Sequence, residues 1–189
     1  SAALGGCKET EGPLGGCFDI QLDDDKFGES SWEKAESKMQ KETIHKLLQK
    51  AQLAPSDVQY IFAGDLLNQC ISSSFGLRDF GIPFFGLYGA CSTMAEGLSL
   101  ASMIVEGGFA TRCIALTSSH FASAERQFRF PMEYGGQRTP SAQWTVTGCG
   151  AVVVTSENSP GCPRVNHITT GVIVDLGVKD ANNMGAAMA

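Results

Sequence analysis

A short apolar run, a tight turn of small residues and an apolar helix follow one another between residues 83 and 105, and this unit most constrains the fold. Residues 84–88 lie between Pro83 and Gly89 and are typical of a buried strand. Residues 95–105 place apolar side chains at helical spacing with few charges. The unit predicts a strand that leads directly into a buried helix, as in α/β proteins.

Cys91 occupies the turn of this unit, at or just before the N-terminus of the predicted helix, and Ser92 and Thr93 are residue types that cap helices. The unpaired N–H groups and dipole of a helix N-terminus stabilise a thiolate or a bound carboxylate. Two functions are therefore open at Cys91: a nucleophile, or a pocket for an anionic ligand. The remaining cysteines are interpreted as inert or merely exposed thiols: Cys7, Cys17, Cys70, Cys113, Cys149 and Cys162.

Strand-like and helix-like segments alternate along the chain. Residues 1–29, rich in glycine and acidic residues, predict an irregular opening loop, and residues 32–51 predict an amphipathic surface helix. Residues 120–134 predict a long loop. Strands are predicted at 58–64, 84–88, 112–119, 150–155 and 165–174. This order indicates an α/β fold with a mixed, mostly parallel five-stranded sheet.

Polar residues follow directly on three of these predicted strands. Asp65 and Asn68 follow the first, Cys91 the second, and Ser119 and His120 the third. Ligands gather beyond the carboxyl ends of parallel strands, so these residues are predicted to share one rim of the sheet. Two structural alternatives stay open: helix capping for Asp65, and a hydrogen-bonded structural role for His120.

Composition excludes several classes of protein. The chain of 189 residues has a formal net charge of −6, whereas a nucleic-acid partner calls for a basic face. Its seven cysteines form no CxxC pair, and no His/Cys cluster has zinc-ligand spacing, so neither a metal site nor a disulfide framework is predicted. No apolar run reaches the roughly 20 residues of a membrane span. A soluble protein with reduced thiols and no cofactor is expected.

Six motifs together resemble the stage V sporulation proteins, a family within the thiolase-like superfamily of thiolases and ketoacyl-carrier-protein synthases. They are GDLLNQ at 64–69, GACST at 89–93, TSSH at 117–120, AERQFR at 124–129, EYGGQ at 133–137 and TVTG at 145–148. The turn around Cys91 indicates only the superfamily, and the block 124–137 singles out the sporulation family. The resemblance covers residues 12–189.

The resemblance implies a thiolase-like half with helices on both faces of the sheet, and αβαβα layers in the complete protein. Residues 1–189 would then form an N-terminal half-domain with a truncated opening strand and an absent C-terminal half. Condensing enzymes of the superfamily take their catalytic histidines, or a histidine and an asparagine, from that second half. We also expect a homodimer, or association with the missing half, with strand 112–119 pairing across the two-fold axis.

The resemblance implies a non-catalytic protein that binds dipicolinic acid, pyridine-2,6-dicarboxylic acid, for its uptake into the developing spore. Other membrane proteins of the stage V sporulation operon are the implied partners, at the spore inner membrane. Arginine forks suit carboxylates, although salt bridges to Glu125 or Glu133 are an alternative for the arginines. The ligand-binding residues expected are Cys91, Ser92, His120, Arg126, Arg129, Asp65 and Asn68.

Two other functions stay open. One is a thioester-dependent acyl-transfer or condensing enzyme in which Cys91 is the nucleophile. The other is an interaction scaffold that docks membrane proteins and leaves its pocket unused.

Overall fold

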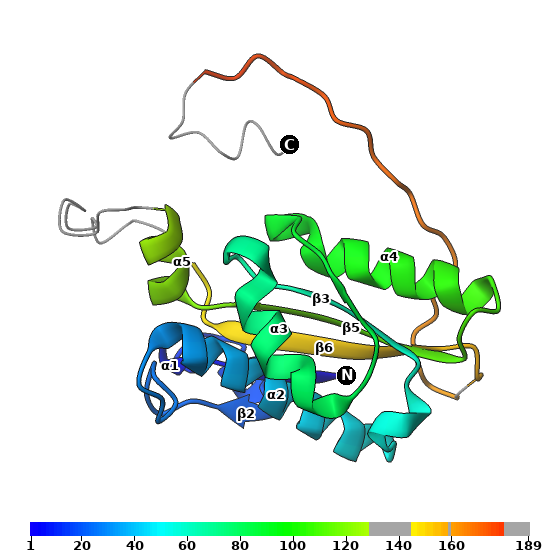
Figure 1. Cartoon of the computed structure of the whole chain (residues 1–189), viewed down its shortest axis with the longest axis horizontal. Helices are drawn as coiled ribbons and strands as arrows, with labels where there is room; N and C mark the ends of the chain where they lie inside the picture. The colour runs from blue at the N-terminus through cyan, green and yellow to red at the C-terminus, as the bar shows by residue number, and fades with distance from the viewer. Residues whose placement is uncertain (129–144, 159, 180–189) are drawn as a thin grey trace.

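A six-stranded mixed sheet forms the centre of the protein in its computed structural model, which describes residues 1–128, 145–158 and 160–179 (Figure 1). The strand order is β2-β1-β6-β5-β3-β4. The strands are β1 (Ala2–Gly5), β2 (Ile20–Gln21), β3 (Tyr60–Gly64), β4 (Phe84–Gly86), β5 (Arg112–Ser119) and β6 (Gly148–Thr155). The sheet is thus mixed as predicted, with one strand more than expected.

Strand direction sets which ends meet. β4, β3 and β5 run parallel to one another, and β1 runs parallel to β2. β6 lies between β5 and β1 and is antiparallel to both. The carboxyl ends of β3, β4 and β5 therefore lie along one edge of the sheet.

In the described parts of the chain, five α-helices connect or cover these strands: α1 (Cys7–Thr10), α2 (Trp32–Ala51), α3 (Ile71–Leu77), α4 (Thr93–Glu106) and α5 (Phe121–Phe128). The longest, α2, begins at Ser31, whose hydroxyl accepts a hydrogen bond from the Lys34 N–H at 3.3 Å. It ends at Gln52, which has the left-handed conformation common after helices (φ 55°). The predicted helix 32–51 is confirmed.

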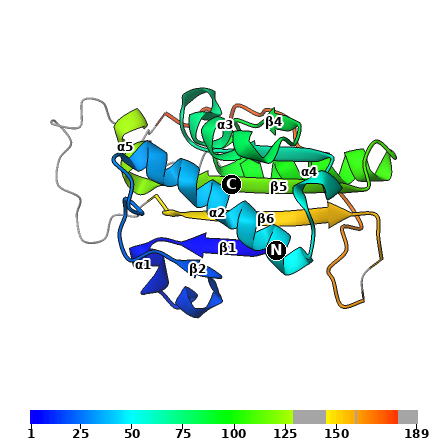
Figure 2. The ribbon, with the colours of Figure 1, turned by 60° about the horizontal axis from the view of Figure 1, so that its bottom comes forward.

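Helices lie on both faces of the sheet, as predicted (Figures 1 and 2). On one face α2 packs against β6, β1 and β5, with α3 beside it. On the other face α4 packs against β3 and β5. Alternation along β3 serves both faces, because Ile61 belongs to the core under α2 and Phe62 to the core under α4.

Both cores are built from buried apolar side chains. The core under α2 joins Met39 and Leu47 to Ile114 and Leu116 of β5, all at most 1% exposed. The core under α4 is smaller and is built around Phe62, Leu87 and Ala101. Burial of apolar surface contributes about 25 cal/mol per Å², and this stabilises the packing on both faces of the sheet.

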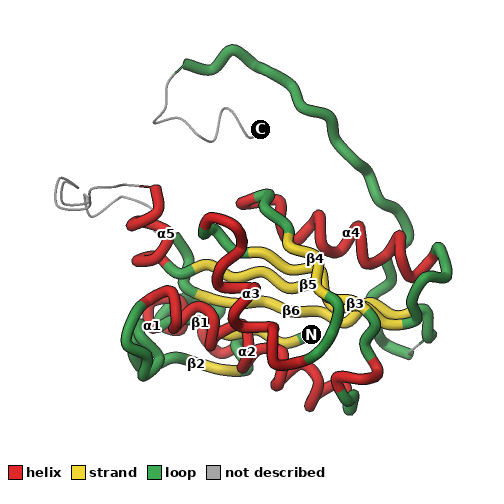
Figure 3. The backbone as a smooth tube through the Cα atoms, in the orientation of Figure 1, coloured by secondary structure: helices red, strands yellow, loops and turns green. Residues whose placement is uncertain are grey.

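Three predicted segments are wrong. Residues 1–29 are not an irregular loop, because β1, α1 and β2 lie within them and Leu4 is buried under α2. The loop predicted from residue 120 begins instead with the helix α5. Residues 165–174 are not a strand: within the described chain they pair with no other strand and run away from the sheet (Figure 3).

The prediction that strand 112–119 pairs across the two-fold axis of a dimer is also wrong. β5 hydrogen-bonds to β3 on one side and to β6 on the other, so residues 112–119 have no free edge for a second copy. Among the described residues, the outer strands of the sheet are β2 and β4. In the described part of the chain, no helix is long and apolar enough to cross a membrane.

Candidate functional site at the carboxyl edge of the sheet

The predicted rim exists at the carboxyl ends of the three parallel strands. β4 pairs with β3 up to Gly86 and Ala63, and β3 pairs with β5 up to Gly64 and Thr117. The segments that follow these strands therefore leave the sheet side by side, and α5 lies at this end of the sheet (Figure 1). Asp65, the turn at Cys91, and His120 share this edge.

The turn at Cys91 is short and tightly held. Residues Ala90–Ser92 form a single 3₁₀ turn between β4 and α4, and Ala90 has a left-handed backbone (φ 49°). The Ser92 hydroxyl donates to the Gly89 carbonyl at 2.8 Å, and the Gly89 N–H donates to the Thr93 hydroxyl at 3.2 Å. Cys91 and Ser92 are exposed to solvent immediately before α4, whereas Thr93, the first residue of the helix, is 2% exposed. The carboxylate of Glu96, in the first turn of α4, lies close to Gly89. The turn therefore makes Cys91 accessible to a ligand, beside a negative charge.

Gly64 allows this close arrangement. A Cβ atom at Gly64 would overlap the carbonyl oxygen of Leu87 and the methyl group of Thr93. The end of β3 thus touches the segment that leads into the cysteine turn. The glycine at the end of the predicted strand 58–64 is explained by this approach of two backbones.

Asp65 holds the loop after β3 from the inside. It is 1% exposed, and its carboxylate accepts hydrogen bonds from the Leu67 N–H at 2.9 Å and from both the N–H and the hydroxyl of Ser73, at 2.8 and 2.6 Å. This is the capping alternative of the sequence analysis, because Ser73 lies in the first turn of α3. Asn68 is exposed in the same loop and accepts a 3.4 Å hydrogen bond from the Tyr88 hydroxyl.

His120 is fully buried at the junction of β5 and α5. Its Nδ1 accepts from the Ala122 N–H at 3.2 Å, and this assigns the proton to Nε2, which donates to the Asp25 carbonyl at 2.6 Å. Both ring nitrogens are thus occupied by backbone groups. These contacts give His120 the hydrogen-bonded structural role that the sequence left open as an alternative to ligand binding.

The two predicted arginines are placed only in part. Arg126 lies on α5, which starts at this edge, so its backbone is near the rim. Arg129 and Glu133 lie outside the described residues. Within the described residues, no group of three or more His, Cys, Asp or Glu side chains is arranged to hold a metal ion.

A buried polar cluster beneath the rim was missed by the sequence analysis. Glu36 of α2 is fully buried and accepts hydrogen bonds from the hydroxyls of Ser118 and Ser123, both at 2.8 Å. Gln40, one turn later, donates from Nε2 to the hydroxyls of Ser118 at 2.7 Å and Ser73 at 3.0 Å. One pattern in the sequence could have indicated this cluster. Glu36 and Gln40 are four residues apart and lie beside Met39, on the apolar face of α2.

Burial is the main reason that the pKa of Glu36 is raised to about 7. The negative charge of Asp65 adds to this rise, and the hydroxyl hydrogen bonds oppose it. Burial likewise raises the pKa of the Cys113 thiol to about 11 and that of the Cys149 thiol to about 12. These two cysteines are inert, as predicted.

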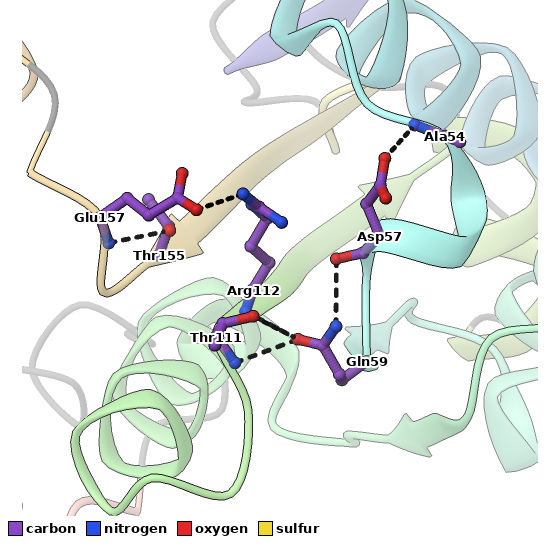
Figure 4. Close-up of polar contacts among 7 residues, drawn as sticks. All are labelled: Ala54, Asp57, Gln59, Thr111, Arg112, Thr155 and Glu157. Carbon is purple, nitrogen blue, oxygen red and sulfur yellow. Dashed lines mark hydrogen bonds and ion pairs between the residues drawn. The ribbon is translucent and has the colours of Figure 1, made fainter.

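The opposite end of the sheet carries a structural clamp (Figure 4). The side-chain oxygen of Gln59 accepts from the N–H groups of Thr111 and Arg112, at 3.0 and 2.9 Å, before β3 and β5 begin to pair. Arg112 forms an ion pair with Glu157, just after β6. Side-chain hydrogen bonds and an ion pair therefore hold together the end of the sheet where β3 and β5 begin. At the carboxyl edge, by contrast, Cys91 and Asn68 are exposed to solvent.

Comparisons with known proteins place the chain in a family. Residues 1–189 match the family model described as stage V sporulation protein AD. The chain is 46% identical over 184 residues to stage V sporulation protein AD of Bacillus subtilis (strain 168). That alignment covers 97% of the chain and 54% of the relative, so the chain spans about half of the relative's length.

Solved structures show the fold. A type III pentaketide synthase from Neurospora crassa matches 75% of this chain and 43% of its own, with a TM-score of 0.53 and 14% identity. The tetronic acid condensing enzyme AbyA1 matches 66% of this chain and 38% of its own, with a TM-score of 0.50 and 18% identity. The fold is therefore thiolase-like, as predicted. With 46% identity to the curated relative and a family match over its whole length, this chain belongs to the stage V sporulation protein AD family.

Proposed function

We propose that the protein binds dipicolinic acid at the carboxyl edge of its sheet and serves the uptake of this dianion into the developing spore. The main support is the turn at Cys91, which exposes this residue to solvent at the start of α4 in a member of a sporulation family. A helix N-terminus favours a carboxylate because its N–H groups and dipole point toward the ligand.

The two ligand carboxylates call for two sets of donors. The N-terminus of α4, with Cys91 and Ser92, is proposed to bind one, and a guanidinium group from Arg126 or Arg129 the other. Asn68 is exposed beside this turn through its contact with Tyr88 and supplies a further polar group. The proposal thus gives the dianion one cation and one helix dipole, which must also offset the carboxylate of Glu96 in the first turn of α4.

Asp65 and His120 have a different place in this proposal. The carboxylate of Asp65 and both ring nitrogens of His120 already have hydrogen-bond partners within the protein. We propose that they hold the loops after β3 and β5 in position beneath the ligand.

Calorimetric titration of the full-length protein with dipicolinate tests the proposal. Cys91→Ala combined with Arg126→Ala is expected to weaken binding by at least about tenfold, because a hydrogen bond to a charged group contributes about 1.5–3 kcal/mol. The matched control is Cys162→Ala combined with Arg164→Ala, which removes an exposed thiol and a guanidinium from the segment after β6. Absence of binding at millimolar ligand, or equal affinity in both double variants, would contradict the proposal.

A second candidate function is acyl transfer, with Cys91 as the nucleophile. One observation favours it: the thiol is exposed at a helix N-terminus, in the fold of condensing enzymes. Incubation with acyl-coenzyme A followed by peptide mass spectrometry separates the candidates, with the exposed Cys162 as the internal control for unselective acylation. A stable adduct at Cys91 alone favours catalysis, and equal or no labelling favours binding.

Partners and location complete the proposal. We propose that the protein works beside the spore inner membrane with membrane proteins of its operon, and that it associates with a second copy or with the remainder of a longer protein. Support comes from the exposed apolar side chains of Met103 and Phe109, on and just after α4.

A further inference from the structure

The buried cluster beneath the rim connects two carboxylates through a continuous chain of hydrogen bonds. Glu36 accepts from Ser118, Ser118 accepts from Gln40, Gln40 also donates to Ser73, and Ser73 donates to Asp65. Every distance in this chain lies between 2.6 and 3.0 Å. The chain ties α2 to the end of β5, to the start of α3 and to the loop after β3.

Two polar atoms of the cluster have no hydrogen-bond partner among the described residues: the buried side-chain oxygen of Gln40 and the buried hydroxyl of Ser72. Glu36 and Gln40 are four residues apart on α2, so their side chains are neighbours. A proton on Glu36 would add a donor beside this unmet acceptor. An unmet buried acceptor costs about 1–3 kcal/mol.

The charges around Glu36 also favour its protonation. The elements around Glu36 bring it no positive charge among the described side chains: Asp65 faces it from the end of β3 and the neutral thiol of Cys149 from β6. α3 contributes the hydroxyls of Ser72 and Ser73, and β5 that of Ser118. Glu125 lies on α5, and His120 at its start holds a single ring proton.

No ion pair formed by the described residues includes Glu36 or Asp65. Two buried carboxylates with no cation beside them among the described side chains favour protonation of one, in line with the raised pKa of Glu36.

We propose that Glu36 is a proton-linked positioning residue for the rim. When it is protonated, the two buried carboxylates share a single negative charge, and the hydrogen-bond chain holds the β5–α5 junction and the loop after β3 against α2. When it is ionised, two buried negative charges face each other and the rim loosens. If the proposed function is right, affinity for a dianion then falls as the pH rises through neutrality.

Amide hydrogen exchange on the full chain at about pH 6 and about pH 8 tests this, after correction for the intrinsic pH dependence of exchange. The amides of Ser73 and Ala124, which donate to Asp65 and to the His120 carbonyl, report on the rim. Their protection is expected to fall on the order of tenfold at the higher pH in the wild-type protein. The amide of Gln59, at the opposite end of the sheet, is the internal control.

Glu36→Gln keeps the side-chain shape without a titrating proton, and its rim protection is expected to be independent of pH. Glu42→Gln, on the same helix outside the cluster, is the matched control and should behave as the wild type. An equal loss of protection in Glu36→Gln, or no loss in the wild type, overturns the proposal.

A measurement on the wild-type protein covers the case in which Glu36→Gln does not fold. Carboxyl ¹³C NMR is expected to show one glutamate that titrates near neutral pH. If every glutamate titrates below roughly pH 5.5, within the usual range for this side chain, the proposal is wrong.

Dipicolinate titrations at the same two pH values separate this inference from the proposed function. Affinity should fall more steeply with pH in the wild type than in Glu36→Gln. Absence of binding at both pH values contradicts the proposed function, and the exchange data still decide the role of Glu36.

Discussion

Single residues at the rim divide into those that face solvent and those that hold the rim together. Cys91 and Asn68 are exposed, whereas Asp65 and His120 are buried and their polar atoms form hydrogen bonds within the protein. The position of Cys91 at a helix start was predictable, because a local run of small residues encodes it. The His120 contact with Asp25 spans 95 residues, and no local pattern reports such a partner.

Asp65→Ala tests the holding role of that carboxylate. The substitution leaves the Leu67 and Ser73 N–H groups and the Ser73 hydroxyl without their acceptor in the interior. We expect the free energy of unfolding in urea to fall by about 2–4 kcal/mol. Asp79→Ala removes an exposed carboxylate paired with Lys41 and is expected to leave stability nearly unchanged. Equal effects of the two substitutions would show that Asp65 does not support the loop.

Glu36 gives a pH dependence whose sign is fixed by the rise of its pKa. The folded protein holds this proton up to about pH 7, whereas the unfolded chain releases it near the usual value of about 4.3, so this contribution to stability is lost as the pH rises between these values. The raised pKa corresponds to roughly 3 kcal/mol. Urea unfolding from about pH 5 to about pH 8 should show this loss relative to Glu36→Gln, and parallel curves would contradict it.

Secondary-structure elements were predictable where an apolar period was long. The helix 32–51 and the strand 112–119 were found with their observed bounds. The small element β1 was hidden in a glycine-rich segment, and its four residues are too few for a clear period. The segment 165–174 has strand-like composition, yet a strand exists only through its neighbours, and the described sheet offers it none.

The contact between β3 and the cysteine turn makes its own prediction. Gly64→Ala places a methyl group against the Leu87 carbonyl oxygen, and because backbone cannot rotate away, we expect a loss of about 1–3 kcal/mol or more. Gly150→Ala, on β6, has open space around its Cβ and is the matched control. Thermal unfolding that ranks the two variants equally would show that β3 and this turn do not touch.

For the molecule as a whole, the parallel strands followed from the alternation of elements and the two helix layers from the family resemblance. The antiparallel position of β6 between β5 and β1 followed from neither. Pairing order depends on contacts distant in sequence, and composition does not encode it. Apolar side chains also stay exposed over the β4 edge and α4, including Phe85, Tyr88 and Met103. Such a surface is typical of a protein that associates.

Light scattering tests this association. The mass is expected to exceed the 20.0 kDa of one chain, either through a second copy or, in the full-length protein, through the remainder of the polypeptide. A monodisperse species of one-chain mass that binds no hydrophobic dye would contradict the prediction.

We propose that a planar dicarboxylate binds at the carboxyl edge of the sheet, over the turn at Cys91. A crystal structure of the full-length protein with dipicolinate is the decisive experiment. One ligand carboxylate is expected within hydrogen-bonding distance of the N-terminus of α4, and the ring beside the loop that carries Asn68. Ligand bound elsewhere, or a carboxyl edge that stays free at saturating ligand, would contradict it.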